Sequence, residues 1–433
     1  MTLGDWLYLR IKQGLIVGAI TLLLYLVIDT TFGFLYTPKP YASSIERLNS
    51  PSYINEPYFS ERFLAESFTQ PGGWLTPEGT RLVLPKEFHG DFFNVDVLEP
   101  SGMPYRRTIN PDTPAGDPIK ILLLGGSTIY NSEVPDEYTV ASQLSGILTD
   151  WQGRRYMTFN AGVTSVSSLQ EIDRLKVELQ NGLRPDIVIS YGGVNDVLQG
   201  IYFGNPDGVM FENSQRAPTV TESNLKSRVK ALMPAGLMEF QRKVRAAVSG
   251  KHIYQALMEK QRNDGEREAP IHMKDENHIR NLVVKAKKKY LENMMEGQRL
   301  SREFGFKFIS VLQPHLYAGQ YANDTPDIKL ATKLEDQRLP LVDVAFARAY
   351  PALREAVGEL NNEKVVAHDC SNIFLAKQKN IFLDSHHVNS VGNKMIACAL
   401  ASLVIGHVES GMSDENKAFQ ECSKILGCLP ACG

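Results

Sequence analysis

The run IKILLLGGSTIYN, from Ile119 to Asn131, constrains the fold of this chain more than any other stretch. Its apolar first half predicts a strand buried on both faces, which is typical of a parallel sheet. The strand ends in two glycines, and Ser127 follows where a helix should begin. Such a turn opens at the carboxyl edge of a sheet, where open α/β proteins bind ligands. Alone it is most often only a turn, so its meaning depends on the rest of the chain.

Short apolar runs alternate with helical patterns after this point, and this alternation predicts parallel βαβ units. The predicted strands cover residues 119–125, 156–162, 186–193, 306–313 and 364–369. The predicted helices cover residues 139–151, 168–182, about 275–303, 341–357 and 391–408. The main domain is therefore expected over residues 118–410 with an α/β fold. An insertion over 198–276, long enough for a lid or subdomain, interrupts it.

The first 37 residues differ from the rest and predict a membrane anchor. Gly14 to Ile28 is an unbroken apolar run, and Phe32 to Tyr36 extends it toward the ~20 residues that cross a bilayer. Arg10 and Lys12 precede the run, which favours a single pass with a cytoplasmic N-terminus. No small-residue cleavage site follows, so a retained anchor is favoured over a cleaved signal or a buried core helix. The remainder is then extracytoplasmic, periplasmic or extracellular.

The segments that flank the main domain have their own character. Residues 38–117 are rich in proline, aromatic and small polar residues and predict a stalk followed by short strands, with a hairpin in VLEPSGMPYRRTIN. The tail over residues 411–433 carries Cys422, Cys428 and Cys432, which permits a disulfide outside the cytoplasm without fixing its pairing. The tail offers no histidine or CxxC spacing for a metal.

Charge excludes one class of function. The formal net charge is −3, whereas nucleic-acid binding needs a concentrated basic face, so no nucleic-acid partner is expected. The densest basic run, from Lys285 to Lys289, lies on a helical pattern and predicts a solvated helix face.

Two stretches supply the parts of a site for acyl transfer. A serine is inert at its free pKa and needs a histidine beside it, and Ser127 is the candidate nucleophile. In IFLDSHHVNSVGN, Asp384 and His387 are three residues apart, so on a helical turn the carboxylate reaches the imidazole, whereas His386 faces elsewhere. An isolated Asp-x-x-His is more often surface capping; its place before the last helix favours the catalytic interpretation.

Two further strand ends supply candidate donors for an oxyanion. FNAG ends the second strand at Gly162, whose backbone amide no side chain shields. YGGVND ends the third strand at Asn195, whose side-chain amide is a neutral donor. Each is singly an ordinary turn, but four such stretches in order at carboxyl strand ends are harder to obtain by chance.

These residues resemble the SGNH (GDSL-type) hydrolase superfamily. GGST matches its first block at Ser127, NAG its second at Gly162, GGVND its third at Asn195, and DSHHVNSVG its last at Asp384 and His387. The resemblance implies a three-layer α/β/α, flavodoxin-like fold with a five-stranded parallel sheet. It also implies Ser127 as nucleophile, His387 as base and Asp384 as its partner. The oxyanion hole would consist of the Ser127 and Gly162 amides and the Asn195 side chain. The family motif has aspartate where Gly126 stands here, which affects the subfamily more than the chemistry.

The leading interpretation is a membrane-anchored serine esterase that removes O-acyl (acetyl) groups from an extracytoplasmic carbohydrate or a small ester. The carbohydrate rests on analogy with anchored relatives and on aromatics such as Trp74, Tyr202 and Phe203. An O-acyltransferase would use the same triad, and a catalytically silent polysaccharide-binding scaffold is the alternative from another class. A lipase would need a large apolar lid helix. No metal and no organic cofactor are expected, and His315 is the one other histidine expected near the pocket.

Overall fold

The computed structural model describes nine continuous stretches of the chain, together with a few isolated positions before residue 25 and near residue 330. The stretches are residues 51–69, 74–75, 82–85, 87–111, 117–152, 156–205, 269–318, 339–375 and 381–408. Most of the predicted anchor and insertion and the whole tail lie outside them, so the predicted domain boundaries stay predictions. Within the part that is described, no helix has the length and apolar character needed to cross a bilayer.

The centre of the molecule is a sheet with five parallel strands, which confirms the α/β class. In sequence order these are β6 (Ile119–Gly125), β7 (Tyr156–Gly162), β8 (Ile187–Gly192), β9 (Lys307–Leu312) and β10 (Val366–Asp369). They lie in the spatial order β10-β9-β8-β6-β7. β6 thus lies between β7 and β8. The chain leaves β6 toward β7 on one side and leaves β8 toward β9 on the other, so the direction of the connections reverses at the boundary between β6 and β8. Ligands of open α/β sheets bind at this boundary.

The sheet is larger than the five strands that the resemblance implied. It has eight strands, because β3 (Phe88–His89), β4 (Asn94–Leu98) and β5 (Met103–Arg106) extend it in antiparallel fashion beyond β7. The predicted hairpin is β4–β5, and it covers the edge of β7 that an isolated parallel sheet would leave open. A separate two-stranded sheet joins β1 (Trp74–Leu75) to β2 (Leu82–Val83).

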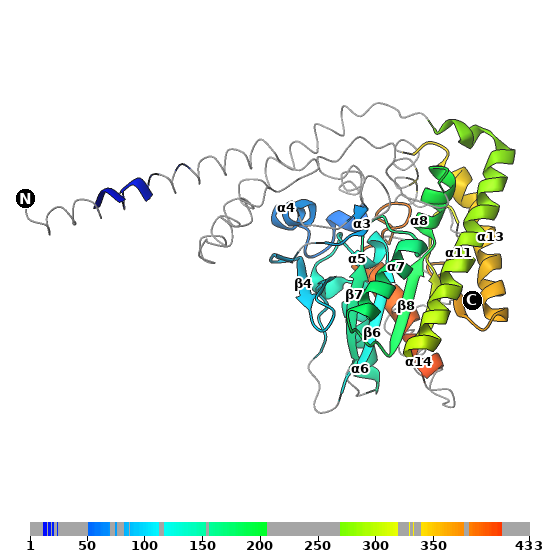
Figure 1. Cartoon of the computed structure of the whole chain (residues 1–433). Helices are drawn as coiled ribbons and strands as arrows, with labels where there is room; N and C mark the ends of the chain where they lie inside the picture. The colour runs from blue at the N-terminus through cyan, green and yellow to red at the C-terminus, as the bar shows by residue number, and fades with distance from the viewer. Residues whose placement is uncertain are drawn as a thin grey trace, which may run out of the picture.

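Helices cover both faces of the sheet and give three layers (Figure 1). One side holds α6 (Val140–Gln152) and α14 (Ser390–Val408); the other holds α7 (Ser168–Gln180), α11 (Glu276–Phe304) and α13 (Val342–Asn362). Alternate strand residues face opposite layers: Ile121 and Leu123 pack toward α6 and α14, and Leu122 and Leu124 pack toward α7 and α11. Both layers therefore fix the position of β6, whose end carries Ser127.

Short elements occupy the carboxyl edge of the sheet and the segment before it. They are α3 (Pro51–Ile54), α4 (Glu61–Thr69), α5 (Ser127–Tyr130), a single turn at Asp136–Tyr138, α8 (Val194–Val197), a wider turn at Leu198–Tyr202 and a turn at Ile271–Lys274.

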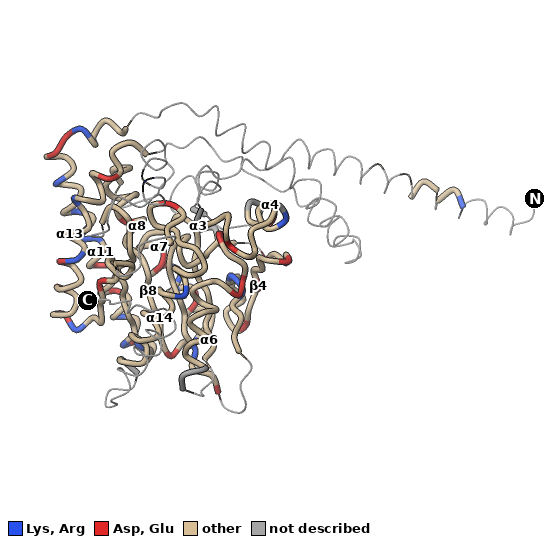
Figure 2. The backbone as a smooth tube through the Cα atoms, turned by 180° about the vertical axis from the view of Figure 1, so that it is seen from behind, with Lys and Arg blue, Asp and Glu red and all other residues tan. Residues whose placement is uncertain are grey.

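The basic run on α11 lies on a face of mixed charge, where Figure 2 shows acidic and basic positions interspersed along α11 and α13. Lys287 forms ion pairs of 2.7 Å with both Glu355 and Glu359 on α13. Lys288 lies 3.8 Å from Glu292 on its own helix. Lys287 therefore joins two neighbouring helices through exposed carboxylates. The run is only partly on the solvated face that the sequence predicts, because Lys285 and Lys288 are exposed whereas Lys287 and Lys289 are half-buried.

A buried arginine joins the antiparallel extension to the loop after α5. Arg106, at the end of β5, forms an ion pair with Asp136, and its Nη2 donates to the carbonyl of Val134 at 3.0 Å. Asp136 also accepts from the side chain of Asn94 at 2.6 Å. The guanidinium lies 4.6 Å from the centre of the Phe93 ring. Because the arginine side chain is fully buried, its charge depends on these partners.

We expect Arg106→Met to lower the free energy of unfolding by about 3–5 kcal/mol, because it leaves the Asp136 carboxylate buried without its partner. The matched control is Arg107→Met, whose side chain is 37% exposed and pairs with Asp96 at 2.6 Å. That change should cost less than about 1 kcal/mol. Urea unfolding measures both variants. Equal effects would mean that the buried ion pair contributes no more than the exposed one.

Candidate active site

The turn after β6 owes its two glycines to close packing. A Cβ on Gly125 would lie 2.5 Å from Cγ1 of Ile129 and 2.8 Å from the carbonyl of Tyr191. A Cβ on Gly126 would lie 2.5 Å from Nδ2 of Asn195. Gly126 has a φ of −81°, so the turn needs no left-handed backbone here. The glycine that departs from the family motif thus makes room for the Asn195 amide.

Asp384 and His387 lie together on a tight loop before α14. His387 Nδ1 lies 2.8 Å from one carboxylate oxygen of Asp384 and 3.0 Å from the other. The backbone amides of His386 and His387 also donate to this carboxylate, at 3.0 and 2.7 Å. Both side chains are buried. The carboxylate therefore has a fixed orientation and can hold the proton of the imidazole on Nδ1.

The loop differs from the expected helical turn. Phe382 pairs with Val388 as an isolated antiparallel bridge, and the amide of Leu383 donates to the carbonyl of His387 at 2.8 Å. The carboxylate reaches the imidazole because the aspartate accepts backbone amides two and three residues ahead, as in an Asx turn.

The structure brings Ser127 to the other side of the imidazole. Its Oγ lies 2.8 Å from His387 Nε2, across 260 residues of sequence. The serine is half-buried, while the histidine and aspartate are buried. The three side chains form one hydrogen-bonded row that can carry the hydroxyl proton to the imidazole. The catalytic roles that the sequence assigns to them stay predictions.

Asn195 lies beside the nucleophile turn. It is the second residue of α8, which follows Gly193 with its φ of 108°. One hydrogen of its amide goes to the carbonyl of Val166 at 2.8 Å, which holds the side chain in place. The amide has two hydrogens, so the second can serve a bound group. The amide of Ser127 begins α5, and the amides of a first helical turn have no partner within their helix.

The sequence predicts a free backbone amide at Gly162, whereas in the structure this amide is already hydrogen-bonded. The Gly162 amide donates to the side chain of Asn160 at 3.1 Å, and Asn160 Nδ2 in turn donates to the carbonyl of Ile129 at 2.8 Å. A Cβ on Gly162 would lie 2.3 Å from the amide nitrogen of Tyr130. The absence of a side chain thus serves the close packing of β7 against α5. The expected role of this amide in an oxyanion hole stays a prediction.

Asn131 fixes the far end of α5, which sequence reasoning missed. It has a left-handed backbone, with φ 54°. Its side chain accepts the amide of Val140 at 2.9 Å and donates to the Thr128 carbonyl at 2.8 Å and to Asn393 at 3.3 Å. It therefore connects the nucleophile turn to α6 and α14. The left-handed tendency of asparagine after a short helix is the only sequence signal for it.

His315, which the sequence placed near the pocket, lies behind the triad. Its ring stacks on Phe346 with centroids 3.4 Å apart and faces the His386 ring at 5.6 Å. The His386 ring is 4.1 Å from that of His387. Burial lowers the pKa of His315 well below its usual range, so the ring is neutral. It therefore supports His386 and His387 by packing.

The segment before the main sheet supports both loops of the site. Ser390 Oγ, just after the His387 loop, donates to Glu56 at 2.6 Å, and Ser67 Oγ donates to the carbonyl of Ser132 at 2.7 Å. An aromatic cluster around Phe63 in α4 packs on Val134 and Leu383. The region over 51–69 therefore contacts the loop after Ser127 and the loop of His387 at once.

The aromatic side chains considered for stacking on a sugar differ in how exposed they are in the structure. Tyr202 is only 2% exposed and belongs to the core, so it does not offer a stacking face, which corrects that expectation. Phe203, beside it, is 38% exposed. The side chain of Trp74 lies outside the described part.

The donor atoms of Asp384, His386 and His387 lie within 4.8 Å of one another, a spacing that a metal ion could use. Two of these residues already hydrogen-bond to each other, and His387 Nε2 also contacts Ser127. An ion would have to replace these hydrogen bonds, so the arrangement fits proton transfer better.

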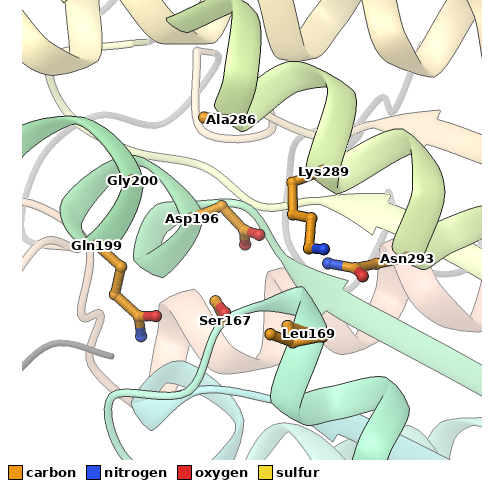
Figure 3. Close-up of a pocket in the computed structure, with 8 residues that line it drawn as sticks. All are labelled: Ser167, Leu169, Asp196, Gln199, Gly200, Ala286, Lys289 and Asn293. Atoms are coloured by element: carbon orange, nitrogen blue, oxygen red, sulfur yellow. The ribbon is translucent and has the colours of Figure 1, made fainter. Parts of the chain in front are cut away.

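A buried polar cluster lies behind Asn195, between α7, α8 and α11. Figure 3 shows the carboxylate of Asp196 pointing into a small pocket, with Lys289 and Asn293 of α11 opposite. Asp196 accepts the amide of Ser168 at 3.2 Å, and Asn293 donates to the Ser168 hydroxyl at 2.8 Å. The Asp196 carboxylate thus fixes the start of α7 to α8.

A second buried carboxyl group lies next to this cluster. Glu171 of α7 accepts from the hydroxyl of Ser190 at 2.6 Å, and a Cβ on Gly192 would lie 2.7 Å from its other oxygen. Burial, helped by the charge of Asp196, raises the pKa of Glu171 to about 8. The carboxyl group is therefore protonated at neutral pH in the folded chain.

Comparisons with known proteins give only distant likenesses. No family model matches the chain. No curated protein matches it either. Solved structures with similar folds include an acetyl xylan esterase, AlAXEase (14% identity, 66% of this chain and 100% of that one, TM-score 0.36). Another is a member of the lipolytic G-D-S-L family from Veillonella parvula (9% identity, 68% of this chain and 99% of that one, TM-score 0.34). A third is a catalytic mutant of the acetylxylan esterase Axe2 from Geobacillus stearothermophilus (11% identity, 67% of this chain and 94% of that one, TM-score 0.34). With TM-scores this low, the functional inference rests on the geometry of the site.

If the Asn195 amide binds the oxyanion as the sequence predicts, we expect Gly126→Ala to slow the reaction of Ser127 with a fluorophosphonate about a hundredfold, because the new Cβ displaces that amide. Gly146→Ala is the matched control, since a Cβ there meets nothing within 4 Å and alanine favours its helix. The rate of labelling measures both. An unchanged rate in the first variant would remove Asn195 from the site.

Glu171 should make stability fall as pH rises. The pKa of Glu171 is about 8 in the folded chain, whereas the usual pKa of a glutamate is 4.5. Between these two pH values the folded state binds more protons than the unfolded state, so stability falls as pH rises. Glu171→Gln should flatten this dependence, and urea unfolding from pH 5 to about pH 9 measures it. Asp173→Asn, an exposed acid on the same helix, should keep the wild-type slope. Parallel slopes for wild type and Glu171→Gln would contradict the raised pKa.

Proposed function

We propose that this chain is a serine esterase of SGNH type, with Ser127 as nucleophile, His387 as base and Asp384 as its partner. The observation that carries the proposal is the continuous row of two hydrogen bonds, each 2.8 Å, from Ser127 Oγ to His387 Nε2 and from His387 Nδ1 to Asp384. A serine hydroxyl, an imidazole and a buried carboxylate in this order are the arrangement that moves the hydroxyl proton to the imidazole in serine hydrolases.

The reaction follows from these positions. The Ser127 oxygen attacks the ester carbonyl while its proton passes to His387 Nε2. The negative oxygen of the tetrahedral intermediate accepts from the Ser127 amide and the Asn195 side chain. When the intermediate collapses, His387 returns the proton to the departing alcohol and an acyl-serine remains. Water then attacks the acyl group and gives a proton to His387. When this second tetrahedral intermediate collapses, the bond between Ser127 Oγ and the acyl carbon breaks, His387 returns the proton to Ser127 Oγ, and the acid leaves.

The substrate that we propose is an O-acyl, specifically O-acetyl, carbohydrate. This part follows the analogy with anchored, extracytoplasmic members of the superfamily. Of Tyr202 and Phe203, only Phe203 is exposed and could stack on a sugar. If a sugar hydroxyl replaced water in the second step, the same triad would make an O-acyltransferase. The experiment below separates the two.

The proposal includes an extracytoplasmic location, with a single membrane anchor over residues 1–37. The apolar run from Gly14 to Ile28 supports the anchor. Cys370, just after β10, is disulfide-bonded, and disulfides persist mainly in oxidising compartments. Both observations agree with a catalytic domain outside the cytoplasm.

We expect the full chain to react with a fluorophosphonate probe at Ser127 and to cleave a small acetyl ester. Ser127→Ala should abolish both, because it removes the oxygen that attacks the probe and the ester. His387→Ala and Asp384→Asn should each lower the ester turnover by about 10³–10⁴-fold, because serine loses its base or the base loses its tautomer. Labelling intensity and acetate release measure these effects.

A matched control variant and a membrane fractionation complete the test. His386→Ala, which changes the neighbouring imidazole, should retain labelling. Labelled protein should stay in the membrane pellet after alkaline extraction if the anchor is retained. Labelling without acetate release would favour the transferase. A folded wild-type chain that neither reacts nor cleaves would overturn the proposal in favour of a binding scaffold.

A further inference from the structure

One buried carboxylate at the site has no part in the mechanism above. Glu133 lies in the loop after α5 and is only 3% exposed. Its Oε1 accepts from the hydroxyl of Ser132 at 2.7 Å and lies 4.0 Å from His387 Nε2. A carboxylate in so buried a place loses much of its hydration, so groups that bind there must match it.

The position of Glu133 relative to Nε2 decides which part of a substrate it meets. His387 Nε2 must come within hydrogen-bond reach of the departing alcohol oxygen in order to return its proton. A group 4.0 Å from this nitrogen therefore stands beside the alcohol part of the ester. The carbonyl oxygen of the acyl part would instead be held by Asn195, whose Nδ2 lies against Gly126 of the nucleophile turn.

The chemistry of a carboxylate defines what it can recognise there. An ionised carboxylate only accepts hydrogen bonds, and it accepts them more strongly than a neutral amide. It favours an alcohol that carries a hydroxyl donor close to the ester oxygen. It disfavours an alcohol with a carboxylate at that place, since like charges repel.

We propose that Glu133 determines the alcohol specificity of the site by accepting a hydrogen bond from a hydroxyl on the carbon next to the ester-bearing carbon, as in a sugar or another polyol. This inference rests on the proposed function and names the substrate class of the same site. Glu133 acts on the bound alcohol and moves no proton of the reaction.

A purely electrostatic role of Glu133 predicts something different. A negative charge near Nε2 stabilises the imidazolium whichever ester is cleaved, so its removal would slow all esters alike. Recognition of a hydroxyl slows only the esters that carry one. Two esters that differ in this hydroxyl alone therefore separate the two roles.

The experiment compares 2-hydroxyethyl acetate with 2-methoxyethyl acetate, which have similar leaving groups. Release of the alcohol in a single turnover is measured, because acylation is common to an esterase and a transferase. We expect the wild type to prefer the hydroxyl ester by about tenfold or more, as for one hydrogen bond to a charged acceptor. Glu133→Gln keeps the shape and an acceptor for Ser132 and should reduce the preference to about twofold.

The matched control is Glu137→Gln, an exposed acid four residues further along, which should keep the wild-type preference. A wild type without preference, or an equal preference in Glu133→Gln, would overturn the inference and leave the proposed esterase intact. Since the wild type alone can give the first result, the test survives a variant that fails to fold. If the wild type released neither alcohol, the proposed function would fall, and this inference with it.

Discussion

The shared register of β6, β7 and β8 is the constraint on which the site depends. Gly125, at the end of β6, pairs with Gly162 of β7 and with Tyr191 of β8. All three strands therefore end at one level, and the residues that follow them meet at one edge. Because two helical layers pack on alternate residues of β6, the register cannot slip by one residue without turning apolar side chains to the wrong layer. Gly125 and Gly162 have no side chain, so neighbouring atoms pack at places where a Cβ would clash with them.

The fold was largely predictable where the pattern is local. The five parallel strands and the helices between them lie within a few residues of the runs read from the sequence, because strands buried on both faces have a continuous apolar signal. The antiparallel extension was predictable only as a hairpin. Its attachment to β7 depends on a single pairing, Arg106 with Asn160, which no local pattern reveals. The predicted anchor before residue 38 lies mostly, and the predicted tail after residue 410 wholly, outside the described residues.

The site was predictable to the extent that its residues follow strand ends. Ser127, Asn195, Asp384 and His387 come together, although the last two do so on an Asx-type loop that spacing alone cannot separate from a helical turn. Gly162 differs because Asn160, two residues before it, takes its amide. Glu133 and Asn131 escaped notice because a glutamate or asparagine in a polar loop looks like a solvated one. Only burial and distance distinguish them, and both depend on the whole fold.

The hydrogen bond between Ser390 and Glu56 has a consequence for the order in which the molecule assembles. It joins residues 334 positions apart, and the contact of Ser127 with His387 spans 260. Contacts at such separations form late, since the chain between them must first be ordered. During synthesis the serine emerges long before its histidine. A growing chain therefore holds an incomplete site until residue 387 has left the ribosome and its imidazole can reach Ser127.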